Sequence, residues 1–167
     1  MARKNPLPAQ PLRVTSKGGN AEERNGESVI DLRIENLTAF RAPLEDLELR
    51  YWLNLDSSTA TDGPSARYAL SLDWASVSDV NLQLAPADVA GQAHYVKVTF
   101  GPRSGMMPRE GKLELKIRLK RLDHQPILQS DDYSYTAGDA HSLNDRIALY
   151  LWGEQVWGVE PGTTAGG

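Results

Sequence analysis

The sequence predicts an all-β protein, an antiparallel β-sandwich, and two observations carry this prediction. Apolar and polar residues alternate through several segments, which is the pattern of strands that are buried on one face only. No segment shows a sustained 3.6-residue apolar period with helix caps. Many short strands without helices are typical of two packed antiparallel sheets.

The clearest alternation lies in residues 30–35, 47–56 and 112–120. In each segment every second residue is large and apolar, and in residues 47–56 this inner set includes Tyr51. We therefore expect three half-buried strands there. Weaker patterns predict further strands at residues 67–74, 79–85, 94–100 and 146–152.

A tight turn is predicted after the last of these strands. The dipeptide Gly153-Glu154 has glycine first, as a two-residue type II′ turn requires. Pairing outward from this turn sets Tyr150 opposite Trp157. The rings of Tyr150, Trp152 and Trp157 are then expected on one face, where cross-strand packing is the commoner role for such a cluster than ligand binding.

Composition excludes several classes of protein. The chain has 167 residues, enough for one domain, and its 18 Lys and Arg against 22 Asp and Glu give a net charge of −4. That balance is not the basic footprint of a nucleic-acid-binding protein. The absence of cysteine excludes disulfides, thiol nucleophiles and cysteine zinc sites. No run approaches the ~20 apolar residues of a membrane-spanning helix.

The two ends of the chain differ in composition from its middle. The first 25 or so residues and the last six are polar and rich in Gly, Pro, Asn or Thr, so both are expected to be linkers. The stretch after Met1 also lacks the apolar core of a signal peptide.

No catalytic constellation is visible. The histidines His94, His124 and His141 are scattered, and there is no G-x-S-x-G, H-E-x-x-H, phosphate-binding or dinucleotide-binding motif. Asp131 and Asp132 could form the carboxylate pair of a glycoside hydrolase. Adjacent aspartates in a loop more often bind a cation or cap a turn, so we predict that the protein is not an enzyme.

Several segments, taken in order, resemble the family 3 carbohydrate-binding modules of cellulases and cellulosomal scaffolds. The most specific are Q-S-D-D-Y-S-Y at 129–135 and V-W-G-V-E-P at 156–161, which carry uncommon residues at fixed spacing. The others are residues 49–56, 71–75, 95–100 and 117–118. The likeness covers residues 12–161 and implies a module there, with a tail at 1–11 and another at 162–167.

The resemblance implies a nine-stranded jelly-roll sandwich without catalytic activity. Such a module is expected to be secreted and monomeric, to bind cellulose or a related β-1,4-glucan, and to be tethered to catalytic or scaffold domains. Neither nucleic acid nor a membrane is an expected partner. The alternative is a diverged module without cellulose binding, which packs on a neighbouring glycoside hydrolase or binds a peptide.

The resemblance also implies a structural calcium ion. Its ligands map onto the backbone carbonyls of Asn54 and Leu128 and the side chains of Asp56, Asp131 and Asp132. Calcium takes six to eight hard oxygen ligands, which such a set with water supplies. A solvated acidic turn is the alternative interpretation.

For the cellulose-binding strip, the family pattern maps onto Asp73, Trp74 and Arg118. His124 stands where that pattern has a tryptophan, and the loop at 76–80 lacks the family's tyrosine. Stacking on an aromatic ring is worth about 1–3 kcal/mol for nucleic-acid bases, so these two departures predict weaker binding.

The direction of Trp74 stays open in the sequence. Simple alternation places it in phase with Leu70 and Leu72, which points it into the core, whereas a bend at the end of the strand would expose it. Arg118 faces outward in either case, as a sugar contact or as an ordinary solvated residue.

A second, shallow groove on the opposite sheet is also implied by the resemblance. Its counterparts here are Arg33, Tyr133 and Tyr135. Tyr51 is a further candidate, although alternation assigns that ring to the core.

Overall fold

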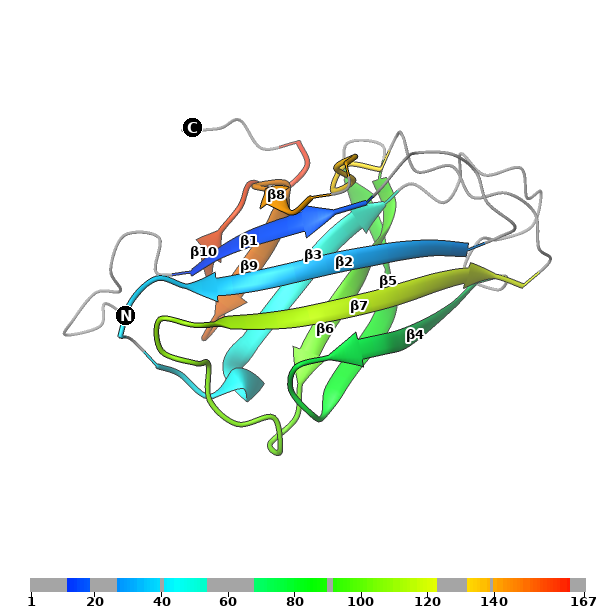
Figure 1. Ribbon diagram of the computed structural model, residues 1–167. Coiled ribbons are helices and arrows are strands. Elements are labelled where there is room, and N and C mark those ends of the chain that lie inside the picture. The colour runs from blue at the N-terminus through cyan, green and yellow to red at the C-terminus, as the bar shows by residue number, and fades with distance from the viewer. Residues whose placement is uncertain are drawn as a thin grey trace.

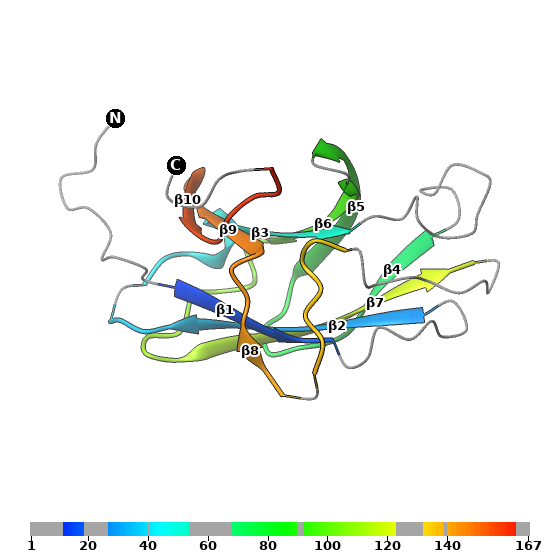
Figure 2. The ribbon, with the colours of Figure 1, turned by 90° about the horizontal axis from the view of Figure 1, so that it is seen from above.

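The computed structural model is a sandwich of two five-stranded sheets, and every strand pair in it is antiparallel. Figure 2 shows the two layers from their edge. The structure describes residues 12–18, 27–39, 41–53, 68–89, 92–122, 132–138 and 140–162. In that part of the chain no helix is long and apolar enough to cross a membrane.

The sheet nearer the viewer in Figure 1 is called the front sheet. Its strands in spatial order are β4 (Tyr68–Ala75), β7 (Lys112–Arg121), β2 (Glu27–Asn36), β1 (Leu12–Lys17) and β8 (Ser142–Leu143). The back sheet consists of β10 (Glu154–Trp157), β9 (Ile147–Leu151), β3 (Leu47–Leu53), β6 (Gln92–Phe100) and β5 (Val80–Val89). One short 3₁₀ turn, η1 (Leu44–Asp46), leads into β3.

The alternation in the sequence determines which face of each long strand is buried. In β2 and β7 the paired residues Leu32 and Leu115, and Ile34 and Leu113, are almost fully buried. From the back sheet, β3 adds inward side chains that include Tyr51, as the pattern predicted. The all-β sandwich is therefore confirmed. The expected count of nine strands is too low, because two five-stranded sheets lie within the described residues.

One strand lies where composition predicted a linker. β1 pairs with β2 along its whole length and with the short β8 on its other side. Leu12 and Val14 are buried in the core. The linker prediction for the first 25 residues is thus wrong for Leu12–Lys17, since two apolar positions are too few to stand out as a period.

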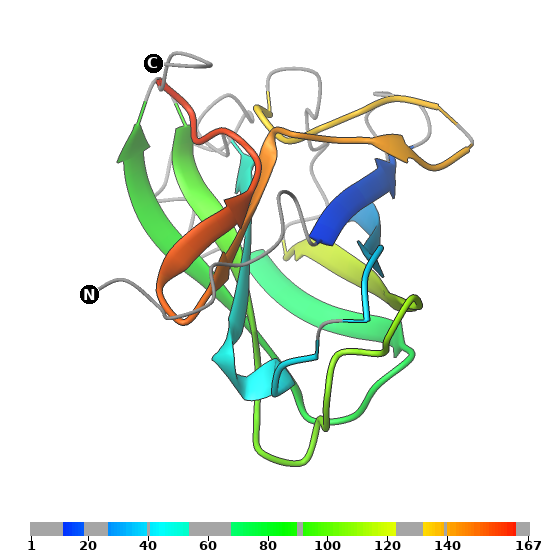
Figure 3. The ribbon, with the colours of Figure 1, turned by 90° about the vertical axis from the view of Figure 1, so that its left-hand side faces the viewer.

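The β9–β10 hairpin, orange to red in Figure 3, turns one residue earlier than the sequence predicted. Leu151 pairs with Glu154, so the turn residues are Trp152 and Gly153. Their φ angles of 54° and 79° are both positive, as a type I′ turn requires. The predicted type II′ turn at Gly153-Glu154 is therefore wrong.

This register separates the three rings that the sequence had placed together. Tyr150 pairs with Gln155, and a register shift follows before Trp157. Trp152 instead donates its indole N–H to Asp46, 3.0 Å away. The expected cross-strand cluster of Tyr150, Trp152 and Trp157 does not form, because a shift of one residue changes which side chains face each other.

Candidate functional site

Trp74 lies on the outer face of the front sheet because β4 contains a bulge. Leu72 pairs with Ile117 and Trp74 pairs with Lys116, so Asp73 is an extra residue in β4. An extra residue changes the face to which the following side chain points. Trp74 is 53% exposed. Of the two directions that the sequence left open, the structure shows the outward one.

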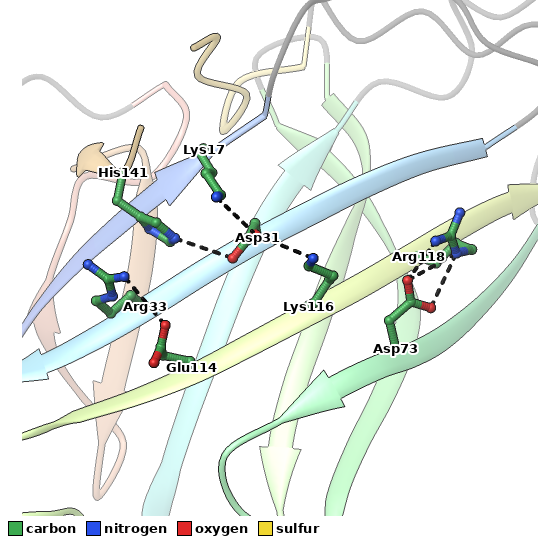
Figure 4. A network of polar contacts seen from close by, with 8 residues as sticks. All are labelled: Lys17, Asp31, Arg33, Asp73, Glu114, Lys116, Arg118 and His141. Atoms are coloured by element: carbon green, nitrogen blue, oxygen red, sulfur yellow. Dashed lines mark hydrogen bonds and ion pairs between the residues drawn. The ribbon is translucent and has the colours of Figure 1, made fainter. Parts of the chain in front are cut away.

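Asp73 and Arg118 form a two-pronged ion pair beside this ring (Figure 4). Nη2 and Nε of Arg118 donate to Oδ2 of Asp73 over 2.7 and 3.1 Å, and Nη1 donates to Glu27 over 2.7 Å. These contacts fix the guanidinium in one orientation. The hydrogen bonds from Arg118 lower the pKa of Asp73 below its ordinary value of 3.8.

A further network of charged groups continues across the same face (Figure 4). Asp31 on β2 lies 3.9 Å from Nζ of Lys17, 4.0 Å from Nζ of Lys116 and 3.3 Å from Nε2 of His141. Each partner comes from a different element, because cross-strand neighbours on one face stand side by side. Nδ1 of His141 also lies 3.2 Å from the hydroxyl of Thr15.

The predicted calcium ligands are covered only in part. Asn54, Asp56, Leu128 and Asp131 lie outside the described residues, as does His124 of the strip. Asp132 is described and is 7% exposed. Within the described residues, no three acidic or histidine side chains are grouped as metal ligands.

The turn at Asp132 is nevertheless attached to the end of β3. Ser134 N–H donates to the carbonyl of Trp52 over 3.1 Å, and Trp52 N–H donates to Oγ of Ser134 over 2.8 Å. These two hydrogen bonds join the described turn at 132–135 to the end of β3. Burial, followed by the charge of Asp132, raises the pKa of Tyr51 well above its ordinary value.

The residues predicted for the shallow groove do not lie together on the opposite sheet. Arg33 is in β2 of the front sheet and pairs with Glu114 over 3.4 Å. Tyr133 instead packs edge-on against Trp52 of β3, with ring centroids 6.3 Å apart. Tyr135 is buried. The prediction that Arg33 lies on the opposite sheet is therefore wrong, because its strand, β2, pairs with β7 of the front sheet.

The outer face of the back sheet carries a cluster that the sequence did not reveal. The guanidinium of Arg50 lies between two rings, 5.0 Å from the centroid of Tyr95 and 4.6 Å from that of Tyr150. Arg50 also donates to Glu48 over 2.5 Å. Partial burial, followed by the hydrogen bond that its hydroxyl donates to Glu160, raises the pKa of Tyr150. The three residues are diagonal neighbours on adjacent strands, so only the register could have placed them together.

Comparison with known proteins agrees with this architecture. A family model described as a cellulose binding domain matches residues 13–158. Endoglucanase A of Paenibacillus lautus is 29% identical over 132 residues, which are 77% of this chain and 18% of that protein. The anti-sigma-I factor RsgI4 of Acetivibrio thermocellus is 29% identical over 165 residues, 95% of this chain and 30% of that protein. The chain thus spans less than a third of either relative.

Solved structures share the fold over nearly the whole chain. One, described as biomass sensing modules from Rsgi-like proteins of Clostridium thermocellum that resemble a family 3 carbohydrate-binding module, has a TM-score of 0.77 and 26% identity, and the match covers 90% of this chain and 98% of that one. The CBM3a-L domain of scaffoldin cipA from the same organism has a TM-score of 0.79, 20% identity and 96% coverage of both chains, a likeness of fold. Because the family model matches most of its length, the chain belongs to the family 3 carbohydrate-binding modules, which are non-catalytic binding domains.

Proposed function

We propose that this module attaches a larger secreted enzyme or scaffold to cellulose or a related β-1,4-glucan through the outer face of the front sheet. The observation that carries the proposal is the outward ring of Trp74 beside the fixed Asp73–Arg118 pair. An aromatic ring offers a stacking platform for the apolar face of a sugar ring, as it does for nucleic-acid bases. The neighbouring carboxylate and guanidinium supply hydrogen-bond acceptors and donors for hydroxyl groups.

The rigidity of this pair favours binding. Arg118 is held by two carboxylates at once, so little side-chain freedom is lost when a ligand arrives. The module spans residues 12–161 in this proposal, and the polar segments at its ends connect it to other domains. Tethering raises the local concentration of the partner domain on an insoluble surface. The endoglucanases among the relatives, of which this chain covers a small share, support such an arrangement.

Removing the ring of Trp74 tests this function. We expect Trp74→Ala to weaken binding to microcrystalline cellulose by about tenfold or more, since a stacking ring is worth about 1–3 kcal/mol. The measurement is depletion of protein from the supernatant over a range of cellulose loadings.

Trp152→Ala is the matched control. Trp152 is also a half-exposed tryptophan, at 45%, but it lies in the β9–β10 turn of the back sheet. Unchanged retention of the Trp74→Ala protein, or an equal loss in the control, would refute the assignment of the binding face. Thermal unfolding of both variants verifies that they are folded.

A second candidate function is peptide binding on the outer face of the back sheet. The observation that favours it is the Tyr95–Arg50–Tyr150 stack, because aromatic-lined surfaces bind extended proline-rich segments. In this case the module is an interaction domain beside a glycoside hydrolase. The cellulose-binding strip also lacks two of the family's aromatic residues, and this favours the same alternative. His124 replaces the tryptophan, and the short loop at 76–80 has no tyrosine.

A titration with a proline-rich peptide distinguishes the two functions. A synthetic peptide with the sequence of residues 4–11 is a suitable probe, and we expect Tyr150→Ala to abolish any binding while Trp74→Ala leaves it unchanged. Isothermal calorimetry supplies the measurement. Peptide binding that survives Tyr150→Ala would exclude this face.

We further propose a structural calcium ion held by the carbonyls of Asn54 and Leu128 and the carboxylates of Asp56, Asp131 and Asp132. The donor set is all oxygen, which is the chemistry calcium prefers. Support comes from Asp132, a buried acidic residue, and from the hydrogen bonds that join Ser134 to Trp52. The ion would join these two segments and neutralise adjacent carboxylates.

A further inference from the structure

The outer face of the front sheet differs in charge from the chain as a whole. Along β7 the outward positions are all charged, and the three lysines there are more exposed than Glu114 and Arg118. Among the described residues of this face the cations outnumber the carboxylates, although the chain carries a net charge of −4. The cations are Arg13, Lys17, Arg33, Lys112, Lys116, Arg118 and Lys120, and the carboxylates are Glu27, Asp31, Glu35, Asp73 and Glu114.

The excess of positive charge lies next to Trp74. Lys116 is the cross-strand partner of Trp74, and its side chain is 47% exposed. Its ammonium group shares Asp31 with Lys17 (Figure 4). The ammonium groups of Lys17 and Lys116 lie 3.9 and 4.0 Å from the same oxygen of Asp31. One carboxylate facing two ammonium groups leaves about one unit of positive charge beside Trp74.

The neighbouring arginines are each matched by at least one carboxylate. Arg118 binds both Asp73 and Glu27, and Arg33 binds Glu114. Lys120, two residues beyond Arg118, is exposed, and its cross-strand partners are the uncharged Ala69 in β4 and Glu27 in β2, whose carboxylate binds Nη1 of Arg118. Lys116 and Lys120 therefore stand on either side of Arg118 in β7, with their Cα atoms about 7 Å from that of Arg118 along the strand.

We propose that this module prefers β-1,4-linked polysaccharides that carry carboxylate groups, as uronic-acid-substituted polymers do, and that Lys116 and Lys120 determine this preference. The inference rests on the proposed function, because the backbone of the polymer must first stack on Trp74. Carboxylates along the bound chain then meet the two ammonium groups. Such exposed ion pairs are individually weak and are screened by salt.

Two soluble polymers with the same backbone provide the test. Affinity gel electrophoresis compares carboxymethyl cellulose, which is anionic, with hydroxyethyl cellulose, which is neutral. We expect tighter binding to the anionic polymer at low salt and a loss of that advantage at about 0.5 M salt, where the Debye length is only a few ångströms. Lys116→Gln combined with Lys120→Gln is expected to reduce the advantage about threefold to tenfold, without changing retardation by hydroxyethyl cellulose.

Lys97→Gln is the control, because Lys97 lies in β6 of the back sheet and its removal changes the net charge in the same direction. Equal affinity for both polymers would overturn this inference while leaving the proposed function intact. An equal loss in the Lys97→Gln protein would overturn the assignment to this face. Failure to bind either polymer or microcrystalline cellulose would refute the proposed function, and this inference with it.

Discussion

At the scale of single residues, Asp73 has two roles in the candidate binding face. As the extra residue of the β4 bulge it directs Trp74 outward, and as a carboxylate it fixes Arg118. Bulges commonly redirect side chains in this way near functional sites. A substitution at Asp73 therefore affects the orientation of the guanidinium as well as its charge.

The ionisation of Asp73 predicts how binding depends on pH. The hydrogen bonds from Arg118 lower the pKa of Asp73 in the folded protein, so its carboxylate stays charged at every pH above the ordinary pKa of 3.8. The contribution of the pair is complete above that value and is lost as the pH falls through the lower folded pKa. We expect cellulose retention to be constant from pH 8 to 5 and to fall only below 3.8.

Depletion assays between pH 3 and 8 measure this profile. Asp73→Asn retains the shape of the side chain without its charge, so its binding is expected to be weaker throughout and to lack the fall at acid pH. A decline of wild-type binding between pH 7 and 5 would show that another group controls the interaction.

At the scale of elements, the turn at 132–135 explains part of the unusual Q-S-D-D-Y-S-Y motif. Ser134 is fully buried, accepts a hydrogen bond from Trp52 N–H and donates one to the carbonyl of Arg146 over 2.6 Å. Asn144 extends the network, since its amide donates to the carbonyl of Ser134 and to Oγ of Ser16. One serine thus joins this turn to β3 and to the start of β9.

Loss of this hydroxyl is expected to destabilise the fold. Ser134→Ala leaves the buried Trp52 N–H without its acceptor, which costs about 1–3 kcal/mol. Urea unfolding measures the change in free energy, and Ser142→Ala, at an exposed serine of β8, is the control. A change within about 0.5 kcal/mol, typical of surface sites, would contradict the structural role of Ser134.

The β9–β10 hairpin illustrates the limit of local sequence rules. Glycine in a two-residue turn is compatible with either type II′ or type I′, according to whether it stands first or second. Here it stands second, after Trp152, a residue type that seldom adopts a positive φ. The pairing of Leu47 with Leu151 continues the apolar contact between β3 and β9, and this packing selects the register.

At the scale of the whole molecule, the proposed calcium ion connects the stability of the sandwich to a ligand. An ion that binds only the folded state raises the free energy of unfolding by about 2.7 kcal/mol at a hundredfold excess over its dissociation constant. We expect chelation with EDTA to lower the melting temperature by about 5–10 °C, and added calcium to restore it.

Scanning calorimetry of the whole chain with and without EDTA measures this effect. Asp132→Asn removes one of the proposed ligands and is expected to abolish the response to calcium. Equal melting temperatures in EDTA and in calcium would refute the proposed ion.

The class of fold and the family can be predicted from residues that lie close together along the chain. Alternation in β2, β3 and β7 specified which side chains enter the core. Burial of apolar surface is the largest favourable contribution to the free energy of folding, and side chains in a strand point to the same face at every second residue. The uncommon residues of the V-W-G-V-E-P segment indicated the family, which the match over residues 13–158 shows.

Which side chains meet on the two outer faces depends instead on how the strands pair in the folded protein. The exposure of Trp74 depends on the bulge in β4. The Tyr95–Arg50–Tyr150 stack depends on the register of three neighbouring strands. The position of Arg33 depends on the order of strands in the front sheet. Each is a relation between strands that are distant in sequence. A shift of one residue in such a relation moves a side chain to the other face, and no local pattern records it.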